Sequence, residues 1–248
     1  MRQVRRPASK PDDCSTRVAG KRIAIVQSNY IPWKGYFDLI NSVDEFVLFD
    51  DVQYTRRDWR NRNRIKTATG LAWLSIPVSS KGHFDAPIKE IRVDDRTWSA
   101  RHWRTIKASY ARASHFRLYS AALENLYLGC DASHLSAINH RFLSGICEIL
   151  GIGTKLSWSW EYEIIAGKTE RLVSICRQAD ASVYVSGPSA ASYLDARQFE
   201  AAGINLVYFD YAGYPTYRQL FPPFDHHVSV LDLILNEGPE ARRFMLSF

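Results

Sequence analysis

Short apolar runs bounded by polar residues begin after residue 21 and return in the last third of the chain. Residues 22–27 and 45–51 are two such runs, and between them a turn with Pro32 and Gly35 leads into about two helical turns at 36–43. Apolar runs of this length are typical of strands buried on both faces. A strand, a helix and a second strand in this order predict a parallel sheet.

The middle of the chain changes to helical periodicity. Residues 71–78 and 88–93 are predicted to be further strands, and residues 97–152 a mainly helical region. Within that region apolar residues recur at intervals of three and four, which gives a helix one apolar face, and Gly151 follows them as a suitable helix end. The clearest apolar face consists of Leu135, Ile138, Phe142, Ile146 and Ile149.

Strands and helices alternate again after residue 152. This order predicts a single α/β domain over residues 22–248, with a parallel, Rossmann-like sheet and the helical region inserted in the sheet or packed against it. Residues 1–21 are basic and lack an apolar stretch, so they are predicted to form a flexible tail and not a secretory signal. The predicted strands are 154–160, 182–187 and 204–211, and the predicted helices are 168–179, 195–203 and 228–238.

The positive charge is concentrated in two short stretches. The net charge is +6, but residues 1–22 hold seven Lys or Arg against two acids, so the rest of the chain is nearly neutral. Within that rest, residues 54–66 (YTRRDWRNRNRIK) hold six Lys or Arg and one acid. A local cluster of cations on a balanced protein favours a small anionic ligand over a broad nucleic-acid surface.

The sequence leaves the geometry of this basic segment open. An extended chain would bring every second side chain to one face, whereas a helix would align side chains three and four apart. Arginine forks bind phosphate or carboxylate oxygens in pairs, although the segment also fits a solvated edge with weak salt bridges. The extended form would group Arg60, Arg62, Arg64 and Lys66, and the helical form Arg57, Arg60 and Arg64.

Two acids stand at the predicted carboxyl end of the second strand, where ligands bind in open α/β sheets. One of them would act as a base toward a substrate amine or hydroxyl, or both would hold Mg²⁺ beside phosphates; the plain alternative is a turn cap or an arginine partner. The predicted catalytic residues are Asp50, Asp51 and Asn63.

Three further segments supply predicted binding residues. The loop after the first strand has the position of a phosphate- or adenosine-binding turn but lacks GxGxxG, the turn at 183–195 suits an anion, and the aromatic segment 209–227 suits a pocket wall. Each of these segments also fits plain core packing or an ordinary tight turn. The predicted substrate-binding residues are Gln27, Asn29, Tyr30, Trp33, Tyr54, Arg57, Arg60, Asn61, Arg62, Arg64, Lys66, Ser186, Gly187, Tyr193, Asp210, Tyr214 and His226.

Several other classes of protein do not fit the sequence. The string at 166–170 is not a Walker A motif, because Tyr162 stands where that motif needs glycine, and the histidines lack the spacing of metal ligands. No run of about 18 apolar residues predicts a membrane span. The four cysteines form no CxxC pair, which is typical of a reduced, cytoplasmic protein.

Taken together, seven stretches resemble the WbqC-like protein family. They are residues 25–40, 43–67, 73–78, 167–176, 184–195, 208–217 and 228–235, and the resemblance extends over roughly residues 22–240. Members are often encoded beside genes for O-antigen, other surface-polysaccharide or amino-sugar synthesis. The resemblance therefore implies an enzyme that modifies a nucleotide-activated or phosphorylated sugar by transfer of an acyl or aminoacyl group. The cofactor stays unknown, with an acyl-CoA and ATP with Mg²⁺ as the open alternatives for the donor.

The chain also departs from the family pattern. Many members have His-Gln-Pro where this chain has Val26, Gln27 and Ser28, so a mechanism that used that histidine would not operate here. The layout of the first strands is similar to that of HUP-type nucleotidylyltransferases, although their HxGH motif is missing. A nucleic-acid-binding protein and a non-catalytic scaffold of a polysaccharide pathway stay open as alternatives, and so does a homo-oligomer.

Overall fold

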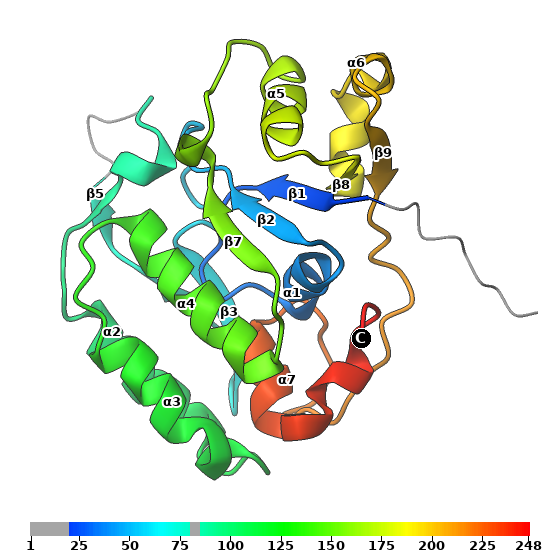
Figure 1. Cartoon of the computed structure of the whole chain (residues 1–248). Helices are drawn as coiled ribbons and strands as arrows, with labels where there is room; N and C mark the ends of the chain where they lie inside the picture. Colours follow the sequence, from blue (N-terminus) through cyan, green and yellow to red (C-terminus); the bar gives the residue numbers. More distant parts are fainter. Residues whose placement is uncertain (1–19, 80–84) are drawn as a thin grey trace, which may run out of the picture.

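The computed structural model describes residues 20–79 and 85–248, and a five-stranded parallel sheet lies at its centre (Figure 1). The strand order is β7-β2-β1-β8-β9, and every neighbouring pair in it is parallel. The predicted α/β fold with a parallel sheet is therefore confirmed. The strands are β1 (Arg22–Val26), β2 (Glu45–Leu48), β7 (Lys155–Trp158), β8 (Val183–Ser186) and β9 (Asn205–Tyr208).

Side chains alternate along each buried strand, so both faces of the sheet are apolar and helices cover both of them. In β1, Ile23 and Ile25 belong to the smaller apolar cluster, whereas Ala24 belongs to the larger one. Helices α5 (Glu170–Gln178) and α6 (Ala196–Ala201) complete the smaller cluster. The larger cluster is completed by α1 (Lys34–Asn41), α4 (Leu135–Leu150) and α7 (Val230–Glu237).

The predicted helical region is also confirmed. Helices α2 (Trp98–Tyr110) and α3 (Phe116–Leu128) lie beside α4 on the outside of the molecule (Figure 1). The helix α4 ends at Gly151, whose φ of 63° suits a glycine. Short 3₁₀ helices occur at Ile88–Glu90, Ser159–Glu161, Pro188–Ser192 and Gly238–Phe244.

Two small antiparallel pairs flank the main sheet: β3 (Arg62–Thr67) with β4 (Gly70–Ser75), and β5 (Val78–Ser79) with β6 (Arg92–Val93). The predicted strand at 88–93 is wrong over its first half, which is a 3₁₀ helix. The reason is that Lys89 N–H donates to the Asp50 carbonyl oxygen at 3.0 Å and Ile88 N–H to that of Val52 at 3.0 Å. These two N–H groups are therefore bonded to the segment after β2 and are not available to pair with a neighbouring strand.

The ends of the described chain bear on two predictions. The predicted tail lies outside the described residues up to residue 19. Lys21, the last residue of that predicted tail, forms an ion pair with Glu45 at 2.7 Å. In the part of the chain that the structure describes, no helix is both long and apolar enough to cross a membrane.

The winding direction of the sheet reverses at β1. The chain runs from β1 to β2 and later β7 on one side, and then to β8 and β9 on the other side. In open α/β sheets ligands bind beyond the carboxyl ends of the strands at such a reversal. The loop that follows β1 therefore lies where a ligand site is expected.

Candidate functional site

A cleft of about 240 Å³ lies beside the loop after β1. Three segments far apart in the sequence form it, and backbone hydrogen bonds join them. Tyr30 N–H donates to the Trp59 carbonyl oxygen at 3.1 Å, and Val230 N–H donates to that of Pro32 at 2.9 Å. The lining residues are Asn29, Pro32, Trp33, Trp59, Asn63 and His227.

Aromatic rings form much of the cleft wall. The Trp33 and His227 rings are stacked, with centroids 6.3 Å apart and planes 27° apart, and Trp59 is 40% exposed. His227 is anchored by Asp225, whose Oδ1 accepts from the His227 N–H at 2.6 Å and lies 3.3 Å from Nδ1. Flat apolar faces of this kind suit a sugar ring or a nucleobase.

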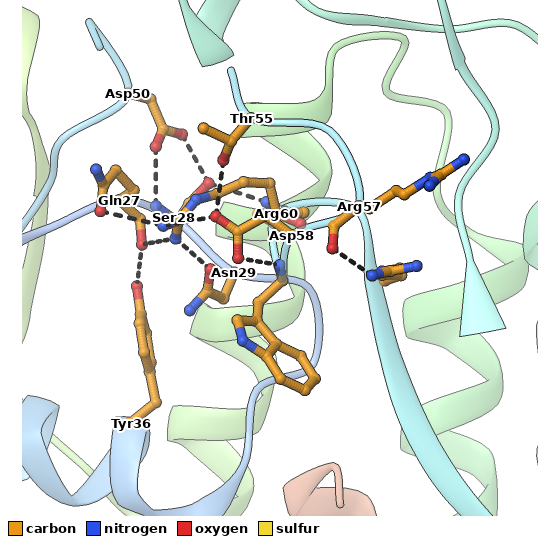
Figure 2. Close-up of polar contacts among 12 residues, drawn as sticks. Gln27, Ser28, Asn29, Tyr36, Asp50, Thr55, Arg57, Asp58 and Arg60 are labelled. Atoms are coloured by element: carbon orange, nitrogen blue, oxygen red, sulfur yellow. Dashed lines mark hydrogen bonds and ion pairs between the residues drawn. The ribbon is translucent and has the colours of Figure 1, made fainter. Parts of the chain in front are cut away.

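Arg60 fixes the polar side chains of the loop after β1. Figure 2 shows its guanidinium alongside Gln27, Asn29 and Asp58. It donates to Gln27 Oε1 at 3.2 Å and to Asn29 Oδ1, and its Nη2 lies 3.5 Å from the Asp58 carboxylate. Because the amide oxygens of Gln27 and Asn29 face Arg60, their amide nitrogens are turned away from it. Arg60 thus sets the orientation of Asn29 on the cleft wall.

Asp50 supports the same loop from within the protein. Its fully buried carboxylate accepts from Ser28 N–H at 2.8 Å, from the Ser28 hydroxyl at 2.7 Å and from the Ser136 hydroxyl at 2.6 Å. Burial raises the pKa of this carboxyl, and those hydrogen bonds and the nearby Arg60 oppose the rise. Asn139 donates to the Ser28 hydroxyl at 2.9 Å. Asp50 is enclosed below the loop and is not part of the cleft wall.

Asp51 turns to different partners from those of Asp50. It forms an ion pair with Lys89 and accepts from the Ser159 hydroxyl at the end of β7. The two neighbouring carboxylates are therefore divided between two polar networks. This division favours a scaffold role for the pair over a shared magnesium site.

The basic segment turns at residues 56–61 and is extended only from Arg62 on, where it forms β3, and it divides its cations instead of gathering them. Arg62 and Arg64 lie on the outer face of the β3–β4 hairpin, where both guanidiniums stand over Trp73. Lys66 is buried, and its amine donates to Gln219 Oε1 at 3.0 Å and to the Pro223 carbonyl oxygen. Arg57 is exposed, with a φ of 58°.

The other predicted binding residues of the loop after β1 and of the basic segment lie in the cleft wall, in a second hollow or in the core. The Asn63 amide donates to the carbonyl oxygens of Tyr30 at 3.2 Å and Ile31 at 3.0 Å, so it holds the loop above the cleft. Tyr54, Arg57 and Asn61 line a second, open hollow of about 560 Å³. Tyr30 is fully buried and belongs to the core.

The Tyr30 hydroxyl leads to a prediction about acid stability. It lies 2.8 Å from Nδ1 of the buried His102, and burial lowers the pKa of His102 from 6.5 to about 4. Below pH 6.5 the unfolded chain binds a proton that the folded protein does not accept, so stability falls as the pH drops toward 4. We expect roughly 3 kcal/mol at most from this residue, at ~1.4 kcal/mol per pKa unit. The free energy of unfolding in urea should differ less between pH 7 and pH 5 for His102→Gln than for the wild type. An equal difference in the two proteins would contradict this role.

Four predicted residues lie at the carboxyl ends of β8 and β9 and do not line the cleft. Ser186 is buried at the end of β8, and Gly187 begins the 3₁₀ helix after it. Tyr193 is exposed, and the Asp210 carboxylate accepts from Ala212 N–H at 2.8 Å. These residues lie at the same carboxyl edge of the sheet as the cleft, but they do not form part of its wall.

The aromatic segment 209–227 stands behind the cleft. The Tyr214 ring contacts Trp33 at 5.5 Å between centroids, and its hydroxyl donates to the buried Asp38 at 2.6 Å. His226 packs on Phe224, and burial lowers the pKa of its imidazole. The next residue, His227, is the one that faces the cleft.

Sequence reasoning missed three of the lining residues, Pro32, Trp59 and His227. Trp59 lies within the basic segment, and its position three residues before the β3 strand was a usable signal. The choice between His226 and His227 has no such signal, because it depends on how the segment packs on Trp33.

The fold and the cleft define an α/β protein with a candidate site where a parallel sheet reverses its winding. The chain belongs to the WbqC-like protein family, whose model matches residues 27–244. It is 52% identical over 225 residues to the uncharacterized protein Rv1507c of Mycobacterium tuberculosis, covering 91% of this chain and 97% of that protein. No solved structure matches the chain.

Proposed function

We propose that the protein is a transferase that adds an acyl or aminoacyl group to a nucleotide-activated or phosphorylated amino sugar. The observation that carries the proposal is the cleft, where the Trp33, Trp59 and His227 rings and the Asn29 amide meet beside the winding reversal. Aromatic faces bind a sugar ring, and a few polar groups fix its orientation. A volume of about 240 Å³ suits one ring of such a ligand.

The lining residues divide the proposed work. Among them His227 has the titratable side chain, so we assign it the removal of the acceptor proton, with Asp225 holding its ring. With an acyl-CoA donor, the sugar amine forms an amide bond to the acyl carbon as the carbon–sulfur bond breaks. The amine proton passes through His227 to the leaving thiolate. Asp50, Asp51 and Asn63, which the sequence predicts as catalytic, then act as positioning residues.

A thermal-shift screen tests this proposal. The panel contains nucleotide-activated amino sugars, the same nucleotides without sugar, acyl-CoA, ATP with Mg²⁺, and a single-stranded oligonucleotide. An activated amino sugar should raise the melting temperature more than its parent nucleotide does, because a tight ligand stabilises the folded state by mass action. A rise with the oligonucleotide alone would support nucleic-acid binding instead, and no rise with any activated sugar would contradict the proposal.

A further inference from the structure

The outer face of the β3–β4 hairpin and the turn before it carry two tryptophans and two arginines, Trp59, Arg62, Arg64 and Trp73, which we call the tryptophan–arginine face. The Arg62 guanidinium lies 4.3 Å from the centre of the Trp73 ring, and that of Arg64 lies 5.6 Å from Trp73 and 5.8 Å from Trp59. The two indole rings are 5.6 Å apart. Trp73 is 47% exposed, so its ring stays open to a ligand.

The strand register produces this face. Arg64 pairs with Trp73 across the hairpin, and Arg62 lies two positions before Arg64 on the same side. Asn63 and Ile65 point to the other side and are buried. One explanation of the stacking is that the guanidiniums only shield the indole rings from water. That explanation does not account for the charge and the hydrogen-bond donors of the two arginines.

The two arginines have unused binding capacity. Within residues 20–79 and 85–248, neither forms an ion pair with a carboxylate, whereas Arg60 nearby is paired with Asp58. Each donates to one backbone carbonyl oxygen, Arg62 to that of Arg57 and Arg64 to that of His227. The Nε of both arginines is shielded from water and has no hydrogen-bond partner. A buried Nε is out of reach of a ligand, so an anion would be bound through the Nη groups of the two guanidiniums.

We propose that the tryptophan–arginine face binds a nucleoside diphosphate, with the diphosphate on Arg62 and Arg64 and the base against Trp73. Guanidinium forks match phosphate oxygens, and stacking on an indole keeps their planar faces occupied while their edges stay available. The face continues into the cleft, because Trp59 belongs to both and Arg64 contacts the lining residue His227. Placing the sugar of the same ligand in the cleft rests on the proposed function; the diphosphate on the face does not.

Calorimetric titration with three probes tests this inference: uridine diphosphate, inorganic pyrophosphate and uridine. The variant carries Arg62→Gln and Arg64→Gln in one protein, and the control carries Arg104→Gln and Arg117→Gln, an equal change of charge at two exposed positions on α2 and α3. We expect the double variant to bind both diphosphates at least tenfold more weakly and uridine unchanged, while the control binds all three like the wild type. A thermal melt of each protein confirms that it is folded.

The possible results separate this inference from the proposed function. Wild-type protein that binds neither diphosphate, or a double variant that binds both normally, would overturn the inference. An oligothymidylate that binds the wild type more tightly than uridine diphosphate, with a steep salt dependence, would also overturn it. If pyrophosphate binding depends on the two arginines but no activated amino sugar raises the melting temperature more than its parent nucleotide does, the inference stands and the transferase proposal fails.

Discussion

Asp50→Ala is expected to lower the free energy of unfolding by about 3 kcal/mol or more. The substitution removes a buried carboxylate that accepts from Ser28 N–H, the Ser28 hydroxyl and the Ser136 hydroxyl. Each buried donor left without a partner costs ~1–3 kcal/mol, and the lost side chain leaves a cavity beneath the loop after β1. Urea unfolding at neutral pH measures the change.

Asp51→Asn is the matched control for this measurement. It changes the neighbouring carboxylate, whose partner Lys89 is partly exposed, and we expect a loss below ~1 kcal/mol. Equal losses for the two variants would contradict the scaffold role of Asp50. A folded, stable Asp50→Ala protein without transferase activity would point instead to the catalytic role that the sequence suggests.

Trp59→Ala is expected to weaken binding of an activated amino sugar by about 10- to 100-fold, since stacking of a base on an aromatic side chain contributes ~1–3 kcal/mol. Stability should fall by only about 1 kcal/mol, because the residue is 40% exposed and packs on Trp73 at the surface. Calorimetric titration measures the affinity, and a urea melt the stability.

Trp160→Ala provides a closely matched control. Trp160 has the same exposed fraction as Trp59, 40%, but it stacks on Trp158 at the end of β7 and does not line the cleft. Its removal should leave the affinity unchanged. Equal weakening by both substitutions would mean that neither ring marks the site, and a full effect of Trp160→Ala alone would move the site to the β7 edge.

The fold was accessible from the sequence because its strands and helices have local patterns. Residues 22–27 and 45–51 are apolar runs between turn residues, and the α4 face repeats at helical spacing, so each element could be predicted from its own residues. The segment at 88–93 was predicted wrongly because Asp50 and Val52 accept from its backbone, and those acceptors lie far back in the chain.

The site was accessible only in part. The sequence predicts Asn29, Trp33 and Asn63, which line the cleft, because they follow a strand end or lie in the basic segment. His227 was not predicted, since only the packing of 209–227 on Trp33 decides which of two adjacent histidines faces the cleft.

The basic segment shows the same limit. Its composition predicts a cluster of cations, and its extended form was one of two alternatives. In the structure Arg60 donates to Asn29 and Lys66 donates to Gln219, so these two cations do not lie on the face that Arg62 and Arg64 form. The composition of the segment does not show these contacts. Contacts distant in sequence therefore separate the cations that bind the protein itself from those available to a ligand.

The indole N–H signals of the seven tryptophans test the central claim, that the cleft binds the ring of an activated amino sugar. A ¹H–¹⁵N spectrum is recorded with and without the sugar that gives the largest thermal shift, and Trp33→Phe and Trp59→Phe assign the two signals from the cleft. These two signals should move, while those of Trp98, Trp103, Trp158 and Trp160 stay in place. Binding that shifts Trp158 and Trp160 and leaves Trp33 and Trp59 unchanged would contradict the account.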